Sequence, residues 1–340
     1  MHPEPEWSRP PGWPAGEPAH LPSAGLPAPP RERWGLAVAL FVATFFSTTT
    51  LGANWILAAR TDVVSPIPNY PFFGVVLSPA TIRMVWSSRE LLTTGLSFSL
   101  PVLFIMLCHE LGHYVYCRRY GIAATLPYFV PAPFGLGTLG AFIRIRSLIR
   151  NKRELFDVGI AGPIAGFLAL MPFLVYGIAR SEPVPIVLAK PNDPVMVLQL
   201  PGSSLLTELL TRAFHGPLPA GTVLNLHPFA LAAWVGLLVT ALNLLPLAQL
   251  DGGHILYAVV GERQRKVALP LWLLLVAAGF IHPVWFLWAL IVGLIGLRHP
   301  PVEDARTPLD RGRLVLALIA LAILVLCFMP VPLQDILVQL

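Results

Sequence analysis

Residues 91–117 read LLTTGLSFSLPVLFIMLCHELGHYVYC, and this stretch decides how the chain folds. Its first eighteen residues carry no charged side chain, and the whole run is long enough to cross a bilayer as a helix. The run then meets His109, Glu110 and His113. Ionisable groups inside a membrane cost about 2.5–3.5 kcal/mol each on insertion scales, so they normally face a bundle interior and serve a function. The stretch therefore predicts a membrane helix that carries a functional site.

The composition extends this prediction to most of the chain. Hydrophobic residues make up 55% of the 340 residues and charged residues only 12%, which excludes an ordinary soluble globular protein. We expect an all-α polytopic membrane protein with about seven transmembrane helices, within a range of six to eight. The apolar runs that predict these helices are 34–59, 91–117, 156–179, 229–247, 267–281, 284–297 and 314–329.

The basic residues predict an orientation. With the amino terminus inside, the loops assigned to the cytoplasmic side hold seventeen of the 23 Lys and Arg residues, as the positive-inside rule requires. This asymmetry explains the excess of positive charge without a nucleic-acid partner. We therefore expect a cytoplasmic amino terminus. The expected location is the bacterial inner (plasma) membrane, as an integral protein.

Four parts are predicted along the chain. Residues 1–33 hold ten prolines and no apolar run, which is typical of a disordered cytoplasmic tail. Residues 34–90 are expected to form the first transmembrane helix and an outside loop, residues 91–260 a catalytic membrane core, and residues 261–340 additional transmembrane helices.

The pentapeptide HELGH at residues 109–113 has the HExxH spacing. Two imidazoles at positions i and i+4 lie on one face of a helix, so His109 and His113 can bind one metal ion. Glu110 then lies beside the metal without ligating it, where it can accept a proton from water and pass it to a leaving amine. The alternative is a chance match, which the cost of burying these groups in a membrane makes weaker. Counting back from Arg118 at about 1.5 Å per residue places Glu110 roughly 12 Å inside the membrane.

A third ligand is expected at similar depth on another helix. Asp251 is the only acidic residue between Glu208 and Glu262, and it follows the fourth apolar run at the end that the charge count places inside. The alternative is a loop aspartate that caps a short helix. His254, three residues later, is expected at a helix surface or interface, with a place beside the metal ligands as the other possibility.

Residues 126–145 are apolar but hold three prolines and three glycines, which excludes a regular spanning helix. Irregular backbone at membrane depth survives only inside protein or beside water. We expect a membrane-associated β-hairpin at 137–145, containing Gly137 and Gly140, whose edge pairs with an extended substrate. A re-entrant loop that plugs the bundle is an equal alternative.

Small residues on the third predicted helix indicate close helix packing. Gly159, Gly162 and Gly166 lie there, and Gly162 and Gly166 have the spacing that allows two helices to approach. We expect them to pack against the HELGH helix, while Pro163 frees a backbone carbonyl that a neighbour must satisfy.

Three motifs occur in the order HELGH, GIAGPIAG at 159–166, and Asn243-x-x-Pro-x-x-x-Leu-Asp251-Gly-Gly. Together they resemble the site-2 protease family of intramembrane zinc proteases, and the run FGLGTLGAFI at 134–143 resembles its plastid members and their bacterial relatives. The resemblance implies one Zn²⁺ per chain, bound by His109, His113 and Asp251, with Glu110 as general base. It also implies that Asn243 contacts substrate backbone or stabilises the oxyanion. The outside loop 181–227 is too short for the PDZ domain that many bacterial members carry.

The leading hypothesis is an intramembrane zinc endopeptidase, a metalloprotease acting in regulated intramembrane proteolysis. It would cleave transmembrane segments of single-span proteins near the cytoplasmic face by attack of zinc-activated water. The alternative is a proteolytically inactive scaffold or chaperone that binds single-span proteins in the bilayer. The identity of the substrate, the cleavage sequence and the oligomeric state are not encoded in any motif.

Overall fold

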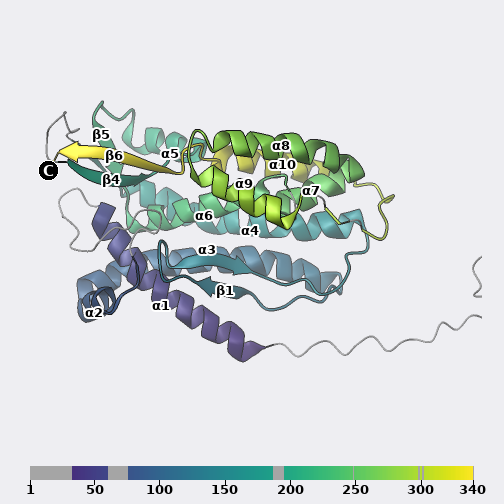
Figure 1. The fold of residues 1–340 in the computed structure, drawn as a ribbon, viewed down its shortest axis with the longest axis horizontal. Coiled ribbons are helices and arrows are strands. Elements are labelled where there is room, and N and C mark those ends of the chain that lie inside the picture. Colours follow the sequence, from purple (N-terminus) through teal and green to yellow (C-terminus); the bar gives the residue numbers. More distant parts are fainter. Residues whose placement is uncertain are drawn as a thin grey trace, which may run out of the picture. The chain divides into compact units, whose positions relative to one another are not determined.

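The computed structural model describes residues 33–59, 76–186, 195–247, 249–297, 299–300 and 302–339. The predicted tail therefore lies outside the described residues apart from Arg33. The described part is mainly helical (Figure 1). Its helices are α1 (Trp34–Ala59), α2 (Pro79–Ser87), α3 (Arg89–Arg119), α4 (Lys152–Ala179), α5 (Leu205–His215), α6 (Pro228–Leu244), α7 (Asp251–Val260), α8 (Gln264–Ala278), α9 (Val284–Ile295) and α10 (Arg311–Cys327).

Six short strands form three antiparallel pairs. They are β1 (Tyr128–Pro131) with β2 (Thr138–Phe142), β3 (Glu182–Pro185) with β5 (Thr222–Asn225), and β4 (Val195–Pro201) with β6 (Leu333–Gln339). The β4–β6 pair brings the end of the chain beside the α4–α6 connection. A hydrogen bond of 2.8 Å from Trp234 Nε1 to the Gly202 carbonyl fastens this connection to α6.

Each of the seven predicted apolar runs overlaps one helix of the structure, although five of these helices begin before the run. Within the described residues, three segments are long and apolar enough to cross a membrane: Trp34–Leu57 of α1, α3 and α4. The remaining helices are shorter, so the count of seven crossings stays a prediction.

The surface of the helical part is rich in apolar side chains. Leu168, Phe280 and Leu294 are 65%, 84% and 79% exposed, and many other large apolar side chains are also exposed. Exposed apolar area on this scale is unusual for a soluble monomer and normally lies against lipid or protein. It agrees with a chain built for a membrane.

Close helix contacts at glycines form the centre of the bundle. Figure 1 shows α3 and α4 lying side by side, and a Cβ added at Gly112 of α3 would lie 2.5 Å from the Ala161 carbonyl oxygen of α4. A Cβ at Gly177 of α4 would overlap the backbone of Ala230 on α6. Small residues let helix backbones approach in this way, and dispersion contacts then replace the hydrophobic effect, which is absent between helices in lipid.

Helix α1 carries a polar stripe of buried serine and threonine side chains, which includes Ser47 and Thr49. Thr49 Oγ1 and Ser99 Oγ of α3 lie 2.7 Å apart, and Ser47 Oγ donates to the Gly137 carbonyl over 2.6 Å. These side chains are buried, so each bond satisfies polar groups that would otherwise be costly in an apolar environment. The stripe fixes α1 against α3 and against the turn between β1 and β2.

The apolar, proline-rich segment after α3 is neither a helix nor an unpaired loop. Residues Tyr128 to Phe142 form the antiparallel pair β1–β2, with Gly137 in the turn at a φ of +82°. The paired region thus starts earlier than the predicted 137–145, and Ile145 makes only an isolated bridge to Ala124. Its association with a membrane stays a prediction.

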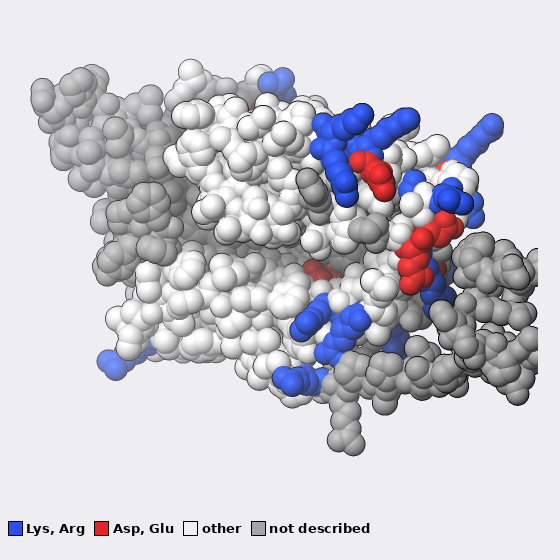
Figure 2. Space-filling view, turned by 45° about the vertical axis from the view of Figure 1, so that its right-hand side comes forward, with Lys and Arg blue, Asp and Glu red and all other residues white. Residues whose placement is uncertain are grey.

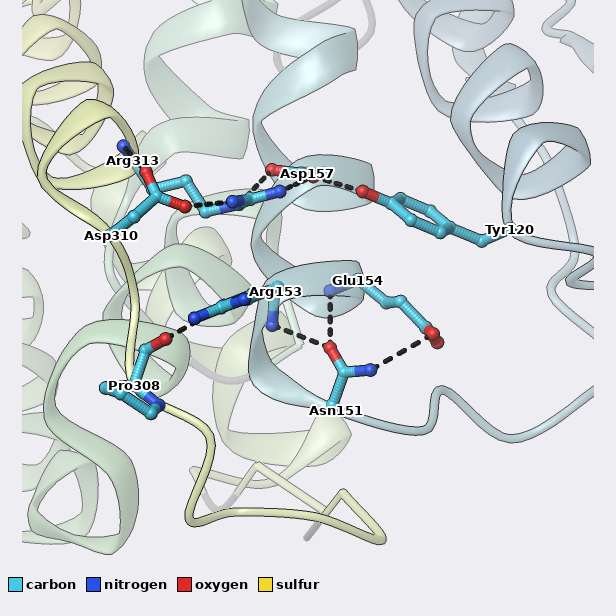
Figure 3. A network of polar contacts seen from close by, with 8 residues as sticks. All are labelled: Tyr120, Asn151, Arg153, Glu154, Asp157, Pro308, Asp310 and Arg313. Carbon is cyan, nitrogen blue, oxygen red and sulfur yellow. Dashed lines mark hydrogen bonds and ion pairs between the residues drawn. The ribbon is translucent and has the colours of Figure 1, made fainter.

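A polar network joins the ends of α3, α4 and α10 (Figure 3). Asn151 caps α4 by accepting hydrogen bonds of 3.0 Å from the backbone N–H groups of Arg153 and Glu154. One turn further on, Asp157 accepts hydrogen bonds from Tyr120, which follows α3, and from Arg313 in the first turn of α10. The network therefore links three helices at one end of the bundle.

Replacing Gly177 by alanine tests the close α4–α6 crossing. The added Cβ has no room beside Ala230, so we expect Gly177→Ala to destabilise the fold by about 1–3 kcal/mol despite the better helix propensity of alanine. Thermal unfolding in detergent measures the effect. Gly293→Ala in α9 is the matched control, because its Cβ would meet Trp272 at an ordinary 3.6 Å. Equal melting temperatures for the two variants would contradict a close contact between α4 and α6 at Gly177.

Candidate metal centre

The two histidines of α3 lie one turn apart and are both buried. His113 Nδ1 lies 2.7 Å from the Val158 carbonyl oxygen of α4. A carbonyl oxygen can only accept a hydrogen bond, so Nδ1 of His113 carries a proton, and in the neutral ring Nε2 then presents a lone pair. That Nε2 points toward Nε2 of His109, 3.1 Å away.

Asp251, the first residue of α7, completes a cluster with these two rings. Its Oδ2 lies 3.3 Å from Nε2 of His109 and 3.3 Å from Nε2 of His113. The helix cap position is Leu250, which makes no side-chain cap bond, and the Asp251 side chain turns toward the histidines instead. This geometry favours the ligand reading of Asp251 over the helix-capping alternative.

Three electron-rich atoms this close together are suited to a shared cation. Ligand atoms about 2.0–2.1 Å from a tetrahedral ion lie about 3.3 Å from one another, which matches the separations seen here. Two imidazole nitrogens and one carboxylate oxygen are also a donor set that zinc accepts, with a fourth position open for catalysis. Among the described residues, these three form the one cluster of His, Cys, Asp and Glu able to hold a metal ion.

Glu110 neighbours this cluster in sequence and is also buried. The backbone N–H of Ile143, directly after β2, faces its carboxylate. The hairpin thus reaches the glutamate that the HExxH pattern predicts as general base.

Asn243 approaches the cluster from the end of α6. Its Nδ2 lies 3.4 Å from Nε2 of His109, at the outer limit of a hydrogen bond. The amide is therefore close enough to reach a group bound beside the metal. The structure brings together residues from α3, α6 and α7, namely His109, Glu110, His113, Asn243 and Asp251.

The glycines of α4 make room for the metal ligands. A Cβ at Gly162 would overlap Nε2 of His113, and one at Gly166 would lie 3.2 Å from Cβ and Nδ1 of His109. Gly159 faces a different helix, because its Cβ would lie 2.9 Å from Cβ of His254 on α7. Pro163, also buried, lies between the two glycines that face the histidines.

The hairpin glycines differ in their surroundings. Gly137 is buried, and a Cβ there would lie 2.6 Å from the backbone of Ser47 in α1, so this residue anchors the hairpin to α1. Gly140 has a φ of +111° and nothing within 4 Å of its Cβ position. Of these two glycines, Gly140 has free space on its Cβ side.

Sequence reasoning missed the surroundings of His254. Its Nδ1 lies 2.6 Å from Nε2 of His299, which is buried and stacks on Tyr257 with ring centroids 4.4 Å apart. His254 is therefore paired rather than free at a helix surface. No sequence signal links the two histidines, because 45 residues separate them and His299 belongs to no motif.

Most of the charged side chains on one face of the molecule lie toward one end. Figure 2 shows Lys and Arg concentrated toward one end of the visible face, while the remainder of that face is mostly uncharged. Two helices of the metal centre have basic residues at the end nearest the site: α3 ends with Arg118 and Arg119, and α4 begins with Lys152. His113 lies five residues before Arg118, which is less than two helical turns.

Replacing Gly162 by alanine tests the fit of the cluster. The new Cβ would take the space of His113 Nε2, so we expect Gly162→Ala to weaken metal binding by at least about tenfold. Metal content after dialysis against a graded chelator measures the change. Gly35→Ala, with nothing within 4 Å of its Cβ, is the control. Unchanged metal binding in Gly162→Ala would show that His113 does not ligate through Nε2.

Comparison with known proteins adds a second kind of support. Residues 97–278 match the model of peptidase family M50. The chain is 31% identical over 285 residues to the probable chloroplastic zinc metalloprotease EGY2 of Oryza sativa subsp. indica, a match that covers 82% of this chain and 50% of the relative. It is 30% identical over 302 residues to the probable chloroplastic zinc metalloprotease EGY1 of Arabidopsis thaliana, covering 87% of this chain and 53% of the relative.

The matched region contains all three sequence motifs and every residue of the cluster, although the chain spans about half the length of the curated relatives it matches. The resemblance inferred from the motifs is thereby confirmed, including its link to the plastid members. The chain belongs to peptidase family M50, the site-2 protease family.

Proposed function

We propose that this chain is an intramembrane zinc endopeptidase that cleaves single-span membrane proteins within their transmembrane segments, near the cytoplasmic face. One observation carries the proposal: three lone-pair atoms from α3 and α7 lie 3.1–3.3 Å apart, Glu110 is their buried neighbour on α3, and α3 is long enough to cross a membrane. The names of the relatives support the same chemistry. Residues 91–260 are the catalytic membrane core.

His109, His113 and Asp251 hold one zinc ion per chain in this proposal. When bound, zinc supplies a positive charge that makes water more acidic and polarises the scissile carbonyl. The hydrogen bond from His113 Nδ1 to the Val158 carbonyl fixes the ring so that Nε2 faces the metal. The close packing of Gly162 and Gly166 holds both rings in place.

Glu110 moves the proton in the reaction. Its carboxylate accepts a proton from the attacking water and delivers it to the nitrogen of the departing amine. Burial of Glu110 excludes bulk water that would compete for this proton. Asn243 donates a hydrogen bond from Nδ2 to the oxyanion that forms at the scissile carbonyl, or to the substrate backbone beside it.

The edge of β2 presents the substrate as an extended strand. A helical substrate hides its carbonyl groups in its own hydrogen bonds, so it must unwind before cleavage. In the described part of the chain β2 pairs only with β1, which leaves one strand edge available for pairing with peptide. The position of Ile143 beside Glu110 puts this edge next to the proposed general base.

The site faces the cytoplasm in this proposal, with the amino terminus on the same side of a bacterial plasma membrane. The basic residues at the ends of α3 and α4 support this orientation, because positive loops stay on the cytoplasmic side. The partners are the lipid bilayer and the single-span substrates within it.

Replacing Glu110 by glutamine tests the reaction. Glutamine keeps the size of the side chain but cannot accept a proton, so we expect Glu110→Gln to lower cleavage of a single-span substrate in proteoliposomes by at least about 10²-fold. Zinc content should stay at one ion per chain, because Glu110 is not a ligand in this proposal. Gel analysis of cleavage and metal analysis of the same sample measure both quantities.

The same measurement separates the protease from the scaffold alternative. A scaffold predicts no cleavage by either form and no requirement for bound zinc. Full cleavage by Glu110→Gln would overturn the role of Glu110, and wild-type protein without zinc would overturn the proposed function as a whole.

Replacing Gly140 by alanine tests the role of the hairpin edge. Its φ of +111° costs a residue with a Cβ about 1–2 kcal/mol, so the strand should shift and kcat/KM should fall by up to about tenfold. Zinc content should not change. Gly216→Ala after α5 is the matched control, because it has a φ of +72° and equal free space. Equal kcat/KM in both variants would remove the hairpin from substrate binding.

A further inference from the structure

The connection between α9 and α10, together with the first turn of α10, contacts α7 and α4 directly and is linked to the end of α3 through α4. This segment, residues 299–313, lies beyond residue 278, where the match to the peptidase family ends. It contacts α7 through His299 and α4 through Arg313. Asp157 of α4 then links Arg313 to Tyr120, directly after α3. Its residues belong to none of the motifs.

The first contact is the histidine pair. His254 follows Asp251 by three residues on α7, so it lies within one turn of the third metal ligand. Its ring meets His299 edge to face, at an interplanar angle of 85° and with centroids 4.9 Å apart. His299 is only 6% exposed and is held between His254 and the ring of Tyr257.

The surrounding hydrogen bonds show which histidine of this pair donates and which accepts. His299 Nδ1 lies 2.6 Å from the Pro300 carbonyl oxygen, which can only accept, so Nδ1 is the donor. Burial lowers the pKa of His299, so its ring is neutral and Nε2 accepts. His254 Nδ1 is then the donor of the 2.6 Å bond between the rings. The orientation of the His254 ring is therefore set by the segment.

The second contact holds the other end of the segment to α4 and α3. The guanidinium of Arg313 donates to both carboxylate oxygens of Asp157, from Nε over 2.8 Å and from Nη2 over 2.5 Å. Asp157 also accepts from the Tyr120 hydroxyl, directly after α3 (Figure 3). Asp304 N donates to the Arg150 carbonyl over 2.7 Å. A bidentate arginine pair of this kind fixes geometry as well as charge.

Helix α7 needs such a support. It has only ten residues, and its cap residue Leu250 makes no side-chain hydrogen bond. A helix this short is not stable alone, so its position depends on packing against its neighbours. A metal ligand must be held to within about 0.5 Å of its productive place. Gly159 lets α7 pack closely on α4, and His299 contacts α7 at the same residue, His254.

We propose that residues 299–313 form a brace that holds Asp251 against His109 and His113, with His299 and Arg313 as positioning residues. His299 acts on Asp251 through His254 and α7. Arg313 fixes the far end of the brace to α4 and, through Asp157 and Tyr120, to the helix that carries the two histidines. The inference rests on the proposed zinc site, and it assigns to the chain beyond residue 278 a role in metal binding.

The experiment measures zinc affinity of the full chain in detergent by competition with a chromophoric chelator. We expect His299→Ala to weaken zinc binding by about 10- to 100-fold, the range for residues that orient metal ligands. His299→Gln should restore most of the affinity, because its side-chain oxygen reaches the position of Nε2 and can accept from His254. His299→Asn is one carbon shorter and should not restore it. Arg313→Ala should weaken zinc binding in the same direction.

A matched control separates positioning from general destabilisation. His215→Ala also removes a histidine hydrogen bond, the 2.7 Å contact of Nε2 with the Ile178 carbonyl at the other end of α4. Melting temperatures of the zinc-free proteins should fall alike for His215→Ala and His299→Ala, and only the latter should lose zinc affinity. Affinity within twofold of wild type in His299→Ala, or equal affinity in the Gln and Asn variants, would overturn the brace. Absence of zinc from the wild type would instead overturn the proposed function.

Discussion

The whole structure depends on bringing three electron-rich atoms within 3.3 Å of one another inside a helical bundle. Left without a cation, two imidazole nitrogens and a carboxylate oxygen in this arrangement present lone pairs to one another at close range. Hydrogen bonds around the site offset this repulsion. The bond from His113 Nδ1 to the Val158 carbonyl, for example, fixes the orientation of the His113 ring. The arrangement makes sense as a site for a metal ion that binds all three.

This constraint explains the glycines of α4. An ordinary side chain at Gly162 would occupy the place of His113 Nε2, and at Gly166 it would crowd His109. The sequence motif that permits close helix packing is therefore also the wall of the metal site. Packing and chemistry cannot be separated here, because the same missing Cβ atoms bring α3 and α4 together and leave room for the ligands.

Local patterns predicted seven of the described helices, but not α2, α5 or α7, and they predicted most of the candidate site. Charge-free runs predicted the long helices, because the length and apolar character of a run can be seen in the run itself. The HExxH spacing predicted that His109 and His113 lie on one face of a helix. Asp251 was predicted as the third ligand because it is the only acidic residue in its part of the sequence and because its expected depth in the membrane matches that of the two histidines. His254, His299 and Arg313 could not be placed in this way, because their contacts join residues 45 or more positions apart and follow no period. The inward stripe of α1 was missed because serine and threonine raise no strong signal within an apolar run.

The brace and the hairpin contact different parts of the metal centre. The hairpin is anchored on α1 by Ser47 and reaches Glu110 through Ile143, while the brace reaches Asp251 through His254. The general base and the third ligand therefore depend on separate parts of the chain for their surroundings. The hydrogen bonds that tie the brace to the bundle go to His254, to Asp157 and to Arg150 and Arg153 around the start of α4, so they need not break when the hairpin moves to admit an extended peptide. A site that must open for substrate can in this way keep its metal.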